Sequence, residues 1–535
     1  MPRPADSARA APTTLAERLG VVGAAVLGLV LRAWGLGYGM PQPWLKPDEL
    51  RWVRISHGLL EDPNPWWFLW PTLHAYVQAA FYWLWGKLLL SLGGLSWHEY
   101  LNPPEGVYPA DLVLMGRWLA VLIGTAAIPL AWALARQTAG RAAGLLAALL
   151  MAVSLGPVRD AHFALVEPFL LVMILATLLA SVQAAEAPSL GRFVLAGFLA
   201  GLACSTKYNA LPTVVAVGAA VVAARHREGR RWWSAPVDAR LLAAGAASVA
   251  GFFAGSPFVI AAWSKFTSAM AIREHSYWDQ MAFDPRLGFV HHLAFTLRYG
   301  HGVVMEVAGI AGLLWLGQRG GGRVAVLAYG LATYLAIGPA RYATMRYATP
   351  LAPVIVVGAA WLAAALAARA GRRAAVAAAA LGVALAAEPL ASSVQLDRLL
   401  ARPDTRQMAR AWLEAHLPRQ ATVMILDGKM LRWGRPLLED RFRVVDFANR
   451  LVRRRRAPYV LVQETDGKWL PSMPHVHALL SAHGSRAVVF DPVAPGARPA
   501  YDPHDAFFVP VGGFRGVTHP GPRITIYRLG PEARP

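Results

Sequence analysis

Long apolar runs separated by short polar loops dominate the chain from its beginning to about residue 391. A helix that crosses a bilayer needs about 20 predominantly apolar residues, and these runs reach or approach that length repeatedly. The pattern predicts about eleven spanning helices. They lie near residues 18–38, 113–135, 142–157, 163–185, 193–206, 209–224, 240–262, 301–316, 323–338, 347–368 and 373–391.

Arginine-rich loops connect many of the predicted spans. Short cytoplasmic loops of membrane proteins carry an excess of Lys and Arg, so the basic loops should share one side of the bilayer. They do so if the N-terminal tail, residues 1–17, is cytoplasmic, and the C-terminal segment then lies outside the cytoplasm. The basic positions are Arg3, Arg9 and Arg18, then Arg136 and Arg141, residues 225–231, Arg319 and Arg323, and residues 369–373.

A further apolar stretch, residues 71–95, would break this agreement if it were counted as a span. It mixes His74, Gln78 and Lys87 with several Trp and Tyr residues, a composition suited to the membrane interface. We therefore expect a helix that lies along the outer membrane surface, within a first extracytoplasmic loop of residues 39–112.

The pattern changes after about residue 392. Short runs of β-branched and apolar residues, typical of buried strands, occur at 422–426, 459–462, 487–490 and 524–527, after a helical pattern at 399–417. Loops rich in Pro and Gly separate them. We expect residues 392–535 to form a soluble extracytoplasmic α/β domain that follows a transmembrane domain of residues 18–391.

Composition supports a polytopic α-helical membrane protein. Of 535 residues, 56% are hydrophobic and only 16% are charged, with a mean hydropathy of +0.38. The formal net charge of +20 could suggest a nucleic-acid partner. The arginines cluster at the ends of apolar runs, however, as orientation in a bilayer requires, so no nucleic acid is expected. The single cysteine, Cys204, excludes an intramolecular disulfide.

Polar residues concentrate on the predicted outer side. The first outer loop contains Lys46-Pro47-Asp48-Glu49, an acidic pair shortly after an apolar run, and carboxylates are costly near hydrocarbon. A transporter would place such groups near the middle of the bilayer, so their position at one surface favours chemistry at the membrane boundary. The other candidate site residues are His74, Arg159, His162, Glu167, Lys207, Tyr208, Arg341, Arg346 and Tyr347.

Two carboxylates with several cations suit glycosyl transfer. No ATP is available outside, so an activated donor must arrive by the membrane, as a sugar on a polyprenyl phosphate does. The basic candidates Arg159, Lys207, Arg341 and Arg346 would bind the phosphate as it leaves. Asp48 would take a proton from an acceptor hydroxyl as its oxygen attacks the anomeric carbon, and one displacement inverts the configuration.

These motifs resemble a bacterial family of multi-spanning glycosyltransferases with the C-type fold, which includes protein O-mannosyltransferases and the lipid A aminoarabinose transferase. The resemblance rests on residues 46–49, 64–76, 159–163, 205–210 and 346–350, which occur in the family's order. It implies a lipid-phosphate sugar donor, a hydroxyl acceptor on a glycan, lipid or protein, and a place in the cytoplasmic (inner) membrane. It also implies that Asp48 is the catalytic base, with Glu49 beside it.

Two positions depart from the family's pattern. Lys46 stands where the family often has His, so a His ligand or proton relay is lost, although a lysine can still meet phosphate. Glu167 stands where Asp is usual. A divalent cation would prefer the oxygens of Asp48, Glu49 and Glu167, which leaves a metal as a possible cofactor.

Each candidate also has a structural interpretation. Asp48 and Glu49 would suit the first turn of a helix that begins at a proline. Lys207 and Arg346 would anchor helix ends by snorkelling, and the candidate tyrosines would belong to the aromatic belt. His162 would satisfy a backbone group.

Two other classes of function stay open from the residues. One is a glycolipid carrier or flippase, in which the acidic pair steers headgroups without bond chemistry. The other is a non-catalytic assembly protein whose outer domain docks partners.

Overall fold

The computed structural model describes residues 12–42, 45–93, 96–102, 110–280, 285–340, 343–426, 435–449, 452, 457–465, 472–503, 505 and 507–530. The chain divides into two compact units. The first, here called the helical unit, comprises Met1–Ala33 and Trp52–Ser393. The second, here called the sheet unit, comprises Trp34–Arg51 and Val394–Pro535.

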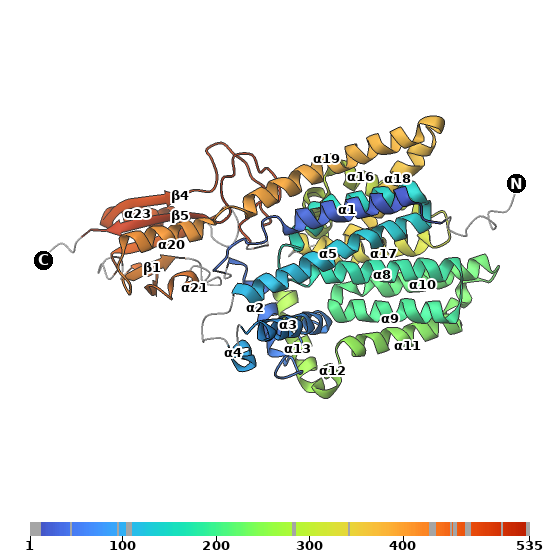
Figure 1. The fold of residues 1–535 in the computed structure, drawn as a ribbon, viewed down its shortest axis with the longest axis horizontal. Coiled ribbons are helices and arrows are strands. Elements are labelled where there is room, and N and C mark those ends of the chain that lie inside the picture. Colours follow the sequence, from blue (N-terminus) through green and yellow to red (C-terminus); the bar gives the residue numbers. More distant parts are fainter. Residues whose placement is uncertain are drawn as a thin grey trace. The chain divides into compact units, whose positions relative to one another are not determined.

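Helices build nearly all of the helical unit, and each predicted span contains one (Figure 1). The unit boundaries fall inside α2 and α19. The helices are α1 (Leu15–Ala33), α2 (Pro47–Gly58), α3 (Leu73–Ser91), α4 (Trp97–Leu101), α5 (Ala110–Ala139), α6 (Arg141–Val153), α7 (Leu155–Asp160), α8 (Glu167–Glu186), α9 (Leu190–Thr206), α10 (Pro212–Arg227), α11 (Ala239–Gly255), α12 (Phe258–Ala261), α13 (Trp263–Gln280), α14 (Pro285–His291), α15 (Arg298–His301), α16 (Val303–Gly317), α17 (Arg323–Ile337), α18 (Ala352–Ala368) and α19 (Ala374–Leu400).

Several of these helices have the length and composition of membrane spans. Within the described ranges, 5 helical segments are long and apolar enough to cross a bilayer, and five more are apolar but shorter. The long ones include α5 and α8, and another contains α18. The prediction of a helical protein with many apolar helices is therefore confirmed, and the count of about eleven spans stays a prediction.

Small residues let neighbouring helices approach closely. Helices α9 and α11 lie side by side (Figure 1). A Cβ added at Gly197 or Gly201 of α9 would collide with the α11 backbone at Ala244 or Ser248. The Ser248 hydroxyl donates a hydrogen bond to the Gly197 carbonyl oxygen at 2.9 Å. Such small-residue contacts are typical of helix pairs in membranes, where van der Waals packing replaces the hydrophobic effect.

A five-stranded mixed sheet forms the centre of the sheet unit. The strand order is β2-β1-β3-β5-β4. Strand β1 pairs in parallel with β2 and β3, with Val423 opposite Val444 and Tyr459, whereas β5 is antiparallel to both β3 and β4. The strands are β1 (Thr422–Leu426), β2 (Arg443–Asp446), β3 (Tyr459–Glu464), β4 (Gly484–Phe490) and β5 (Arg523–Leu529).

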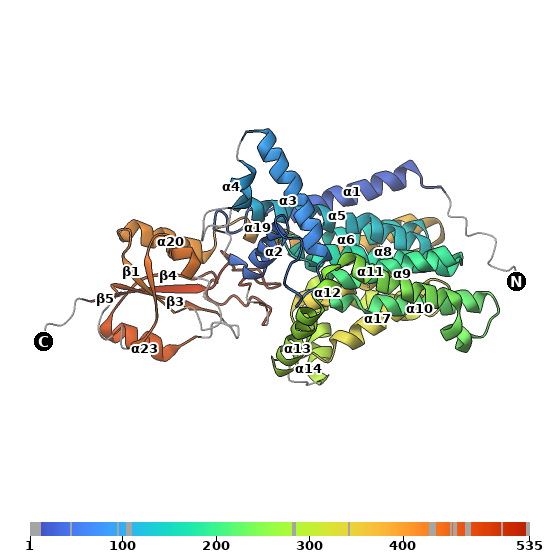
Figure 2. The ribbon, with the colours of Figure 1, turned by 90° about the horizontal axis from the view of Figure 1, so that it is seen from below.

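The two faces of this sheet pack against different helices. Helix α20 (Thr405–His416) covers one face and α23 (Pro474–His483) the other, while the short α21 (Arg435–Leu438) precedes β2 (Figure 2). Side chains alternate across β1, because Val423 packs with Leu413 of α20 whereas Met424 packs with Leu480 of α23. Every predicted strand is present, and the predicted small C-terminal α/β region is confirmed.

The structure corrects two details of this region. The helical pattern at 399–417 is broken, because α19 ends at Leu400 and α20 begins at Thr405. Asp404 caps α20 by accepting the Arg406 backbone N–H at 2.9 Å. Strand β2 was missed by the sequence pattern, because its sequence Arg-Val-Val-Asp is short and flanked by charge.

Candidate active site

A cluster of buried and half-buried charged residues lies at helix ends in the helical unit. Arg159 and Asp160 end α7, and Glu167 begins α8. Lys207 directly follows α9, and Arg346 lies in the 3-10 helix η5 (Met345–Leu351). We call these five residues the ion cluster. They come from four separate segments, so only tertiary packing brings them together.

Glu167 and Lys207 form an ion pair within this cluster. Lys207 Nζ donates a hydrogen bond to Glu167 Oε1 at 2.8 Å. Glu167 is buried, and its other oxygen, Oε2, has no hydrogen-bond partner among the described residues. Lys207 Nζ also lies 5.7 Å from the centroid of the Tyr347 ring, within cation–π range. Arg346 adds a favourable charge interaction with Glu167.

Asp160 is the second carboxylate of the ion cluster. Its Oδ2 accepts a hydrogen bond from Thr349 Oγ1 at 2.6 Å, and its Oδ1 lies 3.7 Å from Arg159 Nη1. Burial, followed by the nearby charge of Glu167, raises the Asp160 pKa to about 6, against the opposing effect of Arg159, Thr349 and Arg346. Asp160 therefore titrates closer to neutral pH than an exposed aspartate does.

Sequence reasoning singled out the stretches 159–163 and 346–350 but assigned no role in the site to Asp160 or Thr349. The signal for Asp160 was a second charged residue next to Arg159, between two apolar runs. Thr349 carried no such signal, because a lone threonine near a helix end is common.

A break between α6 and α7 positions Arg159 and Asp160. The α6 hydrogen-bond ladder stops at Ser154, and α7 starts directly after it. The buried guanidinium of Arg32 in α1 donates to the carbonyl oxygens of Met151 and Ala152, each at 3.1 Å. These contacts satisfy carbonyls in the last turn of α6, so Arg32 stabilises the break.

The two candidate histidines of this unit differ in their surroundings. His162 Nδ1 lies 2.9 Å from the Val158 carbonyl oxygen, which matches its structural interpretation. His74 in α3 is buried between the rings of Trp52 and Phe169. Neither ring nitrogen of His74 has a hydrogen-bond partner among the described residues. Burial lowers its pKa to about 4, despite the charge of Glu167, so the ring is neutral at pH 7.

Tyr208 lies in the 3-10 helix η2 (Tyr208–Ala210), next to Lys207. Its hydroxyl donates a hydrogen bond to the Phe68 carbonyl oxygen at 3.3 Å. This contact ties η2 to the loop before α3. Arg341 lies outside the described residues.

The acidic pair lies in the sheet unit, at the start of α2. Asp48 is half-buried and Glu49 is fully buried in the first turn, where negative charge complements the helix dipole. Before them, Lys46 Nζ donates to Asp505 Oδ1 at 3.0 Å and lies 4.6 Å from the centroid of the Phe507 ring. Both side chains of this ion pair are buried, so it anchors the residue two positions before Asp48.

A metal site does not emerge from these residues. In the part of the chain that the structure describes, no three His, Cys, Asp or Glu side chains gather closely enough to hold a metal ion. Asp48 and Glu49 belong to the sheet unit and Glu167 to the helical unit, where Lys207 already neutralises it.

Known proteins provide matches to this chain in sequence and in fold. Residues 113–273 match the family model described as dolichyl-phosphate-mannose-protein mannosyltransferase. The matched region contains four members of the ion cluster: Arg159, Asp160, Glu167 and Lys207. No curated protein sequence matches the chain at a significant level.

Solved structures extend the likeness to the whole architecture. The apo ArnT of Cupriavidus metallidurans has a TM-score of 0.50 and 15% identity, and the alignment covers 97% of this chain and 98% of that one. The apo oligosaccharyltransferase of Archaeoglobus fulgidus has a TM-score of 0.51 and 12% identity, with 84% and 69% covered. This chain has the C-type glycosyltransferase fold. The resemblance stated from the sequence motifs is therefore confirmed.

The family match and the C-type glycosyltransferase fold together support an enzyme that transfers a sugar. A second structure of the C. metallidurans ArnT, bound to undecaprenyl phosphate, has a TM-score of 0.49 and 16% identity to this chain, with 97% and 99% covered. That ligand belongs to ArnT.

Proposed function

We propose that this protein moves a sugar from a polyprenyl-phosphate donor to a hydroxyl acceptor at the outer face of the cytoplasmic membrane. The sugar is a hexose or a pentose, and the acceptor is a glycan, a lipid or a protein. The observation that carries the proposal is the ion cluster, in which a buried Glu167 holds Lys207 at 2.8 Å. An ammonium group that is fixed in this way can stabilise the negative charge that the phosphate gains during the reaction.

The charge balance of the ion cluster supports an anionic ligand. Arg159, Lys207 and Arg346 supply three positive charges, and Asp160 and Glu167 supply two carboxylates, one of which titrates near neutral pH. A net positive, largely dry cluster attracts a phosphate more strongly than an exposed one does. Tyr208 and Tyr347 flank Lys207, and we assign them, with His162, to the donor site.

His74 is a further candidate for substrate contact. Its neutral imidazole can donate one hydrogen bond and accept another, and both nitrogens lack a partner among the described residues. A buried polar group of this kind is costly unless a ligand satisfies it. Arg341, which lies outside the described residues, keeps its proposed role as a phosphate contact.

In the proposed reaction, Asp48 is the general base. The acceptor hydroxyl oxygen attacks the anomeric carbon, its proton passes to the Asp48 carboxylate, and the bond between that carbon and the phosphate oxygen breaks. The leaving group is the polyprenyl phosphate, and one displacement inverts the anomeric configuration. Glu49 supports the charge of the site, and Lys46, held by Asp505, positions the start of α2.

Replacement of Asp48 by Asn tests the base directly. The change keeps the size of the side chain and removes the proton acceptor, so transfer should fall by about 10²- to 10⁴-fold. The measurement is transfer of a radiolabelled sugar from polyprenyl phosphate to acceptor in proteoliposomes. Glu61→Gln, an exposed acid just after α2, is the matched control and should keep full activity. Wild-type transfer by Asp48→Asn would reject the assignment.

The same proteoliposomes distinguish the carrier alternative. A carrier or flippase would move labelled lipid across the bilayer without release of polyprenyl phosphate. Release of polyprenyl phosphate in step with sugar transfer supports the enzyme. Lipid movement without release would replace it with the carrier.

A further inference from the structure

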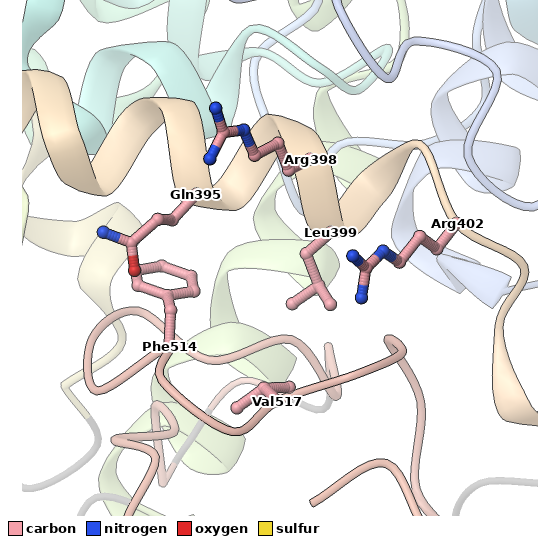
Figure 3. Close-up of a pocket in the computed structure, with 6 residues that line it drawn as sticks. All are labelled: Gln395, Arg398, Leu399, Arg402, Phe514 and Val517. Carbon is pink, nitrogen blue, oxygen red and sulfur yellow. The ribbon is translucent and has the colours of Figure 1, made fainter.

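A pocket of about 130 Å³ lies in the sheet unit, and none of its lining residues is among those assigned to transfer. One wall is the C-terminal end of α19 and the residues after it, and the other is the loop around Phe514 (Figure 3). Figure 3 shows Leu399 and Arg402 reaching from the helix side toward that loop. Six residues line the pocket: Gln395, Arg398, Leu399, Arg402, Phe514 and Val517.

The loop wall is held in place by its backbone. Gly513 and Gly516 lie on either side of Phe514 and Arg515. Their backbone φ angles are +62° and +82°, values that residues other than glycine rarely adopt. A Cβ at Gly513 would lie 2.5 Å from the Arg498 carbonyl oxygen. The loop also forms bridges at Val493–Val517 and Ala500–Gly512. The position of Phe514 is therefore set by the fold.

Hydrogen bonds join the two walls. Arg402 Nη1 donates to the Thr518 carbonyl oxygen at 2.7 Å, and His519 Nδ1 lies 3.1 Å from the Pro403 carbonyl oxygen. A guanidinium has five N–H donors, so Arg402 keeps others for a ligand. No described hydrogen bond or ion pair involves the Arg398 guanidinium, which is exposed.

The lining residues define the chemistry of a ligand. Arg398 lies in the last turn of α19 and Arg402 two residues after the helix ends, and none of the six lining residues is acidic. A guanidinium group binds phosphate oxygens by bidentate, charge-assisted hydrogen bonds. Leu399, Phe514 and Val517 provide an apolar surface beside them, so the pocket suits a phosphate that carries an apolar substituent.

The distance along α19 from the arginines just before it to Arg398 indicates that such a ligand would come from the membrane. Arg373 ends a basic segment just before α19, and Arg398 follows 25 residues later, roughly 37 Å along a helix. A bilayer has a hydrocarbon core of about 30 Å and a total thickness of about 40–45 Å. If α19 crosses the membrane with its arginines at one interface, Arg398 lies at headgroup level on the other side.

We propose that this pocket binds the phosphate headgroup of a membrane lipid, through Arg398 and Arg402, with the start of the lipid's apolar part against Phe514 and Val517. The proposal shares with the proposed function only the assumption that α19 spans the membrane. It gives the sheet unit a lipid contact of its own, separate from the ion cluster.

Site-directed photocrosslinking tests this assignment in the full-length protein. Phe514 is replaced by p-benzoylphenylalanine, and the protein is placed in nanodiscs of phosphatidylcholine with or without phosphatidic acid, a phosphate monoester. We expect crosslinks to phosphatidic acid that fall roughly tenfold with Arg398→Gln, because one charge-assisted contact is lost. Arg486→Gln, which removes an exposed arginine on β4, is the matched control and should not change them.

Three further results decide the source and the independence of the site. Inorganic phosphate that displaces phosphatidic acid in an Arg398-dependent way would assign the same phosphate chemistry to a free ion. Crosslinks that are equal with phosphatidylcholine alone, or unchanged by Arg398→Gln, would overturn the proposal. Asp48→Asn should bind phosphatidic acid like wild type, so failure of the transfer mechanism is distinguishable from failure of this site.

Discussion

Lys207 Nζ lies 2.8 Å from Glu167 Oε1 and so joins the residue after α9 to the first residue of α8. Both side chains are largely removed from solvent. A buried carboxylate that holds an ammonium makes the position of the positive charge definite before any ligand arrives. Preorganised charge of this kind is the usual source of electrostatic catalysis.

Removal of one partner from this ion pair should be worse than removal of both. Lys207→Met leaves Glu167 buried without its main counter-charge and should destabilise the protein by about 3–5 kcal/mol, whereas the double variant with Glu167→Gln should recover much of that loss. The measurement is thermal unfolding in detergent. Both variants should lose sugar transfer. If the loss of stability in the double variant equalled the sum of the losses in the two single variants, Lys207 and Glu167 would not interact energetically.

Asp160 should make the protein less stable as pH rises. Its pKa rises from 3.8 to about 6 in the folded protein, first because of burial and then because of Glu167. The folded state thus binds the proton more tightly, so this contribution is complete below about pH 4 and is lost as pH rises through about 6. The maximum effect is about 3 kcal/mol.

Asp160→Asn therefore should gain stability relative to wild type as pH rises from about 4 to about 8, because the amide never carries the buried charge. Unfolding temperatures in detergent across that range provide the measurement. Asp62→Asn is the control, since hydrogen bonds from Asn64 and Trp66 lower the Asp62 pKa and its stability difference from wild type should therefore stay nearly constant across that range. A pH-independent difference between Asp160→Asn and wild type would contradict the prediction.

Variants of the ion pair between Lys46 and Asp505 test whether Lys46 positions the start of α2 or binds the substrate phosphate. Asp505→Asn leaves a buried ammonium and should cost about 3–5 kcal/mol. Glu439→Gln, which breaks an exposed pair with Arg435 in the same unit, should cost about 0.5 kcal/mol.

Kinetics distinguish the two roles. If Lys46 positions the start of α2, Lys46→Met combined with Asp505→Leu should lower kcat with little change in the KM for the donor. A raised KM with unchanged kcat would instead make Lys46 a phosphate contact, as the sequence first suggested.

Close packing of α9 on α11 predicts that replacement by Ala has opposite effects on stability at two glycines, Gly201 and Gly245. Gly201→Ala forces a methyl group into the Ser248 backbone and should destabilise by about 1–3 kcal/mol. Gly245 lies in α11, where an added Cβ meets nothing within 4 Å. Gly245→Ala should therefore stabilise by about 0.5–1 kcal/mol through higher helix propensity. Equal effects in thermal unfolding would argue against this helix contact.

Much of the local structure follows from the sequence alone. Apolar runs predict helices because a lipid-facing backbone must satisfy its hydrogen bonds within each segment. The short apolar run at 422–426 predicts a buried strand, and residues on either side of β1 do pack against different helices. The motifs around Asp48, Arg159 and Lys207 indicated the C-type glycosyltransferases, because they combine acidic and basic residues beside apolar runs.

Only the tertiary structure decides which charges meet. Thr349 and Asp160 lie 189 positions apart, and Lys46 and Asp505 lie 459 apart. Hydrophobic pattern and local propensity contain no information about such pairs, since partner choice depends on how whole helices and loops pack. The sequence therefore determines where segments form and which residues can do chemistry. Packing determines which of those residues share a low-dielectric environment, and thus their protonation and their role.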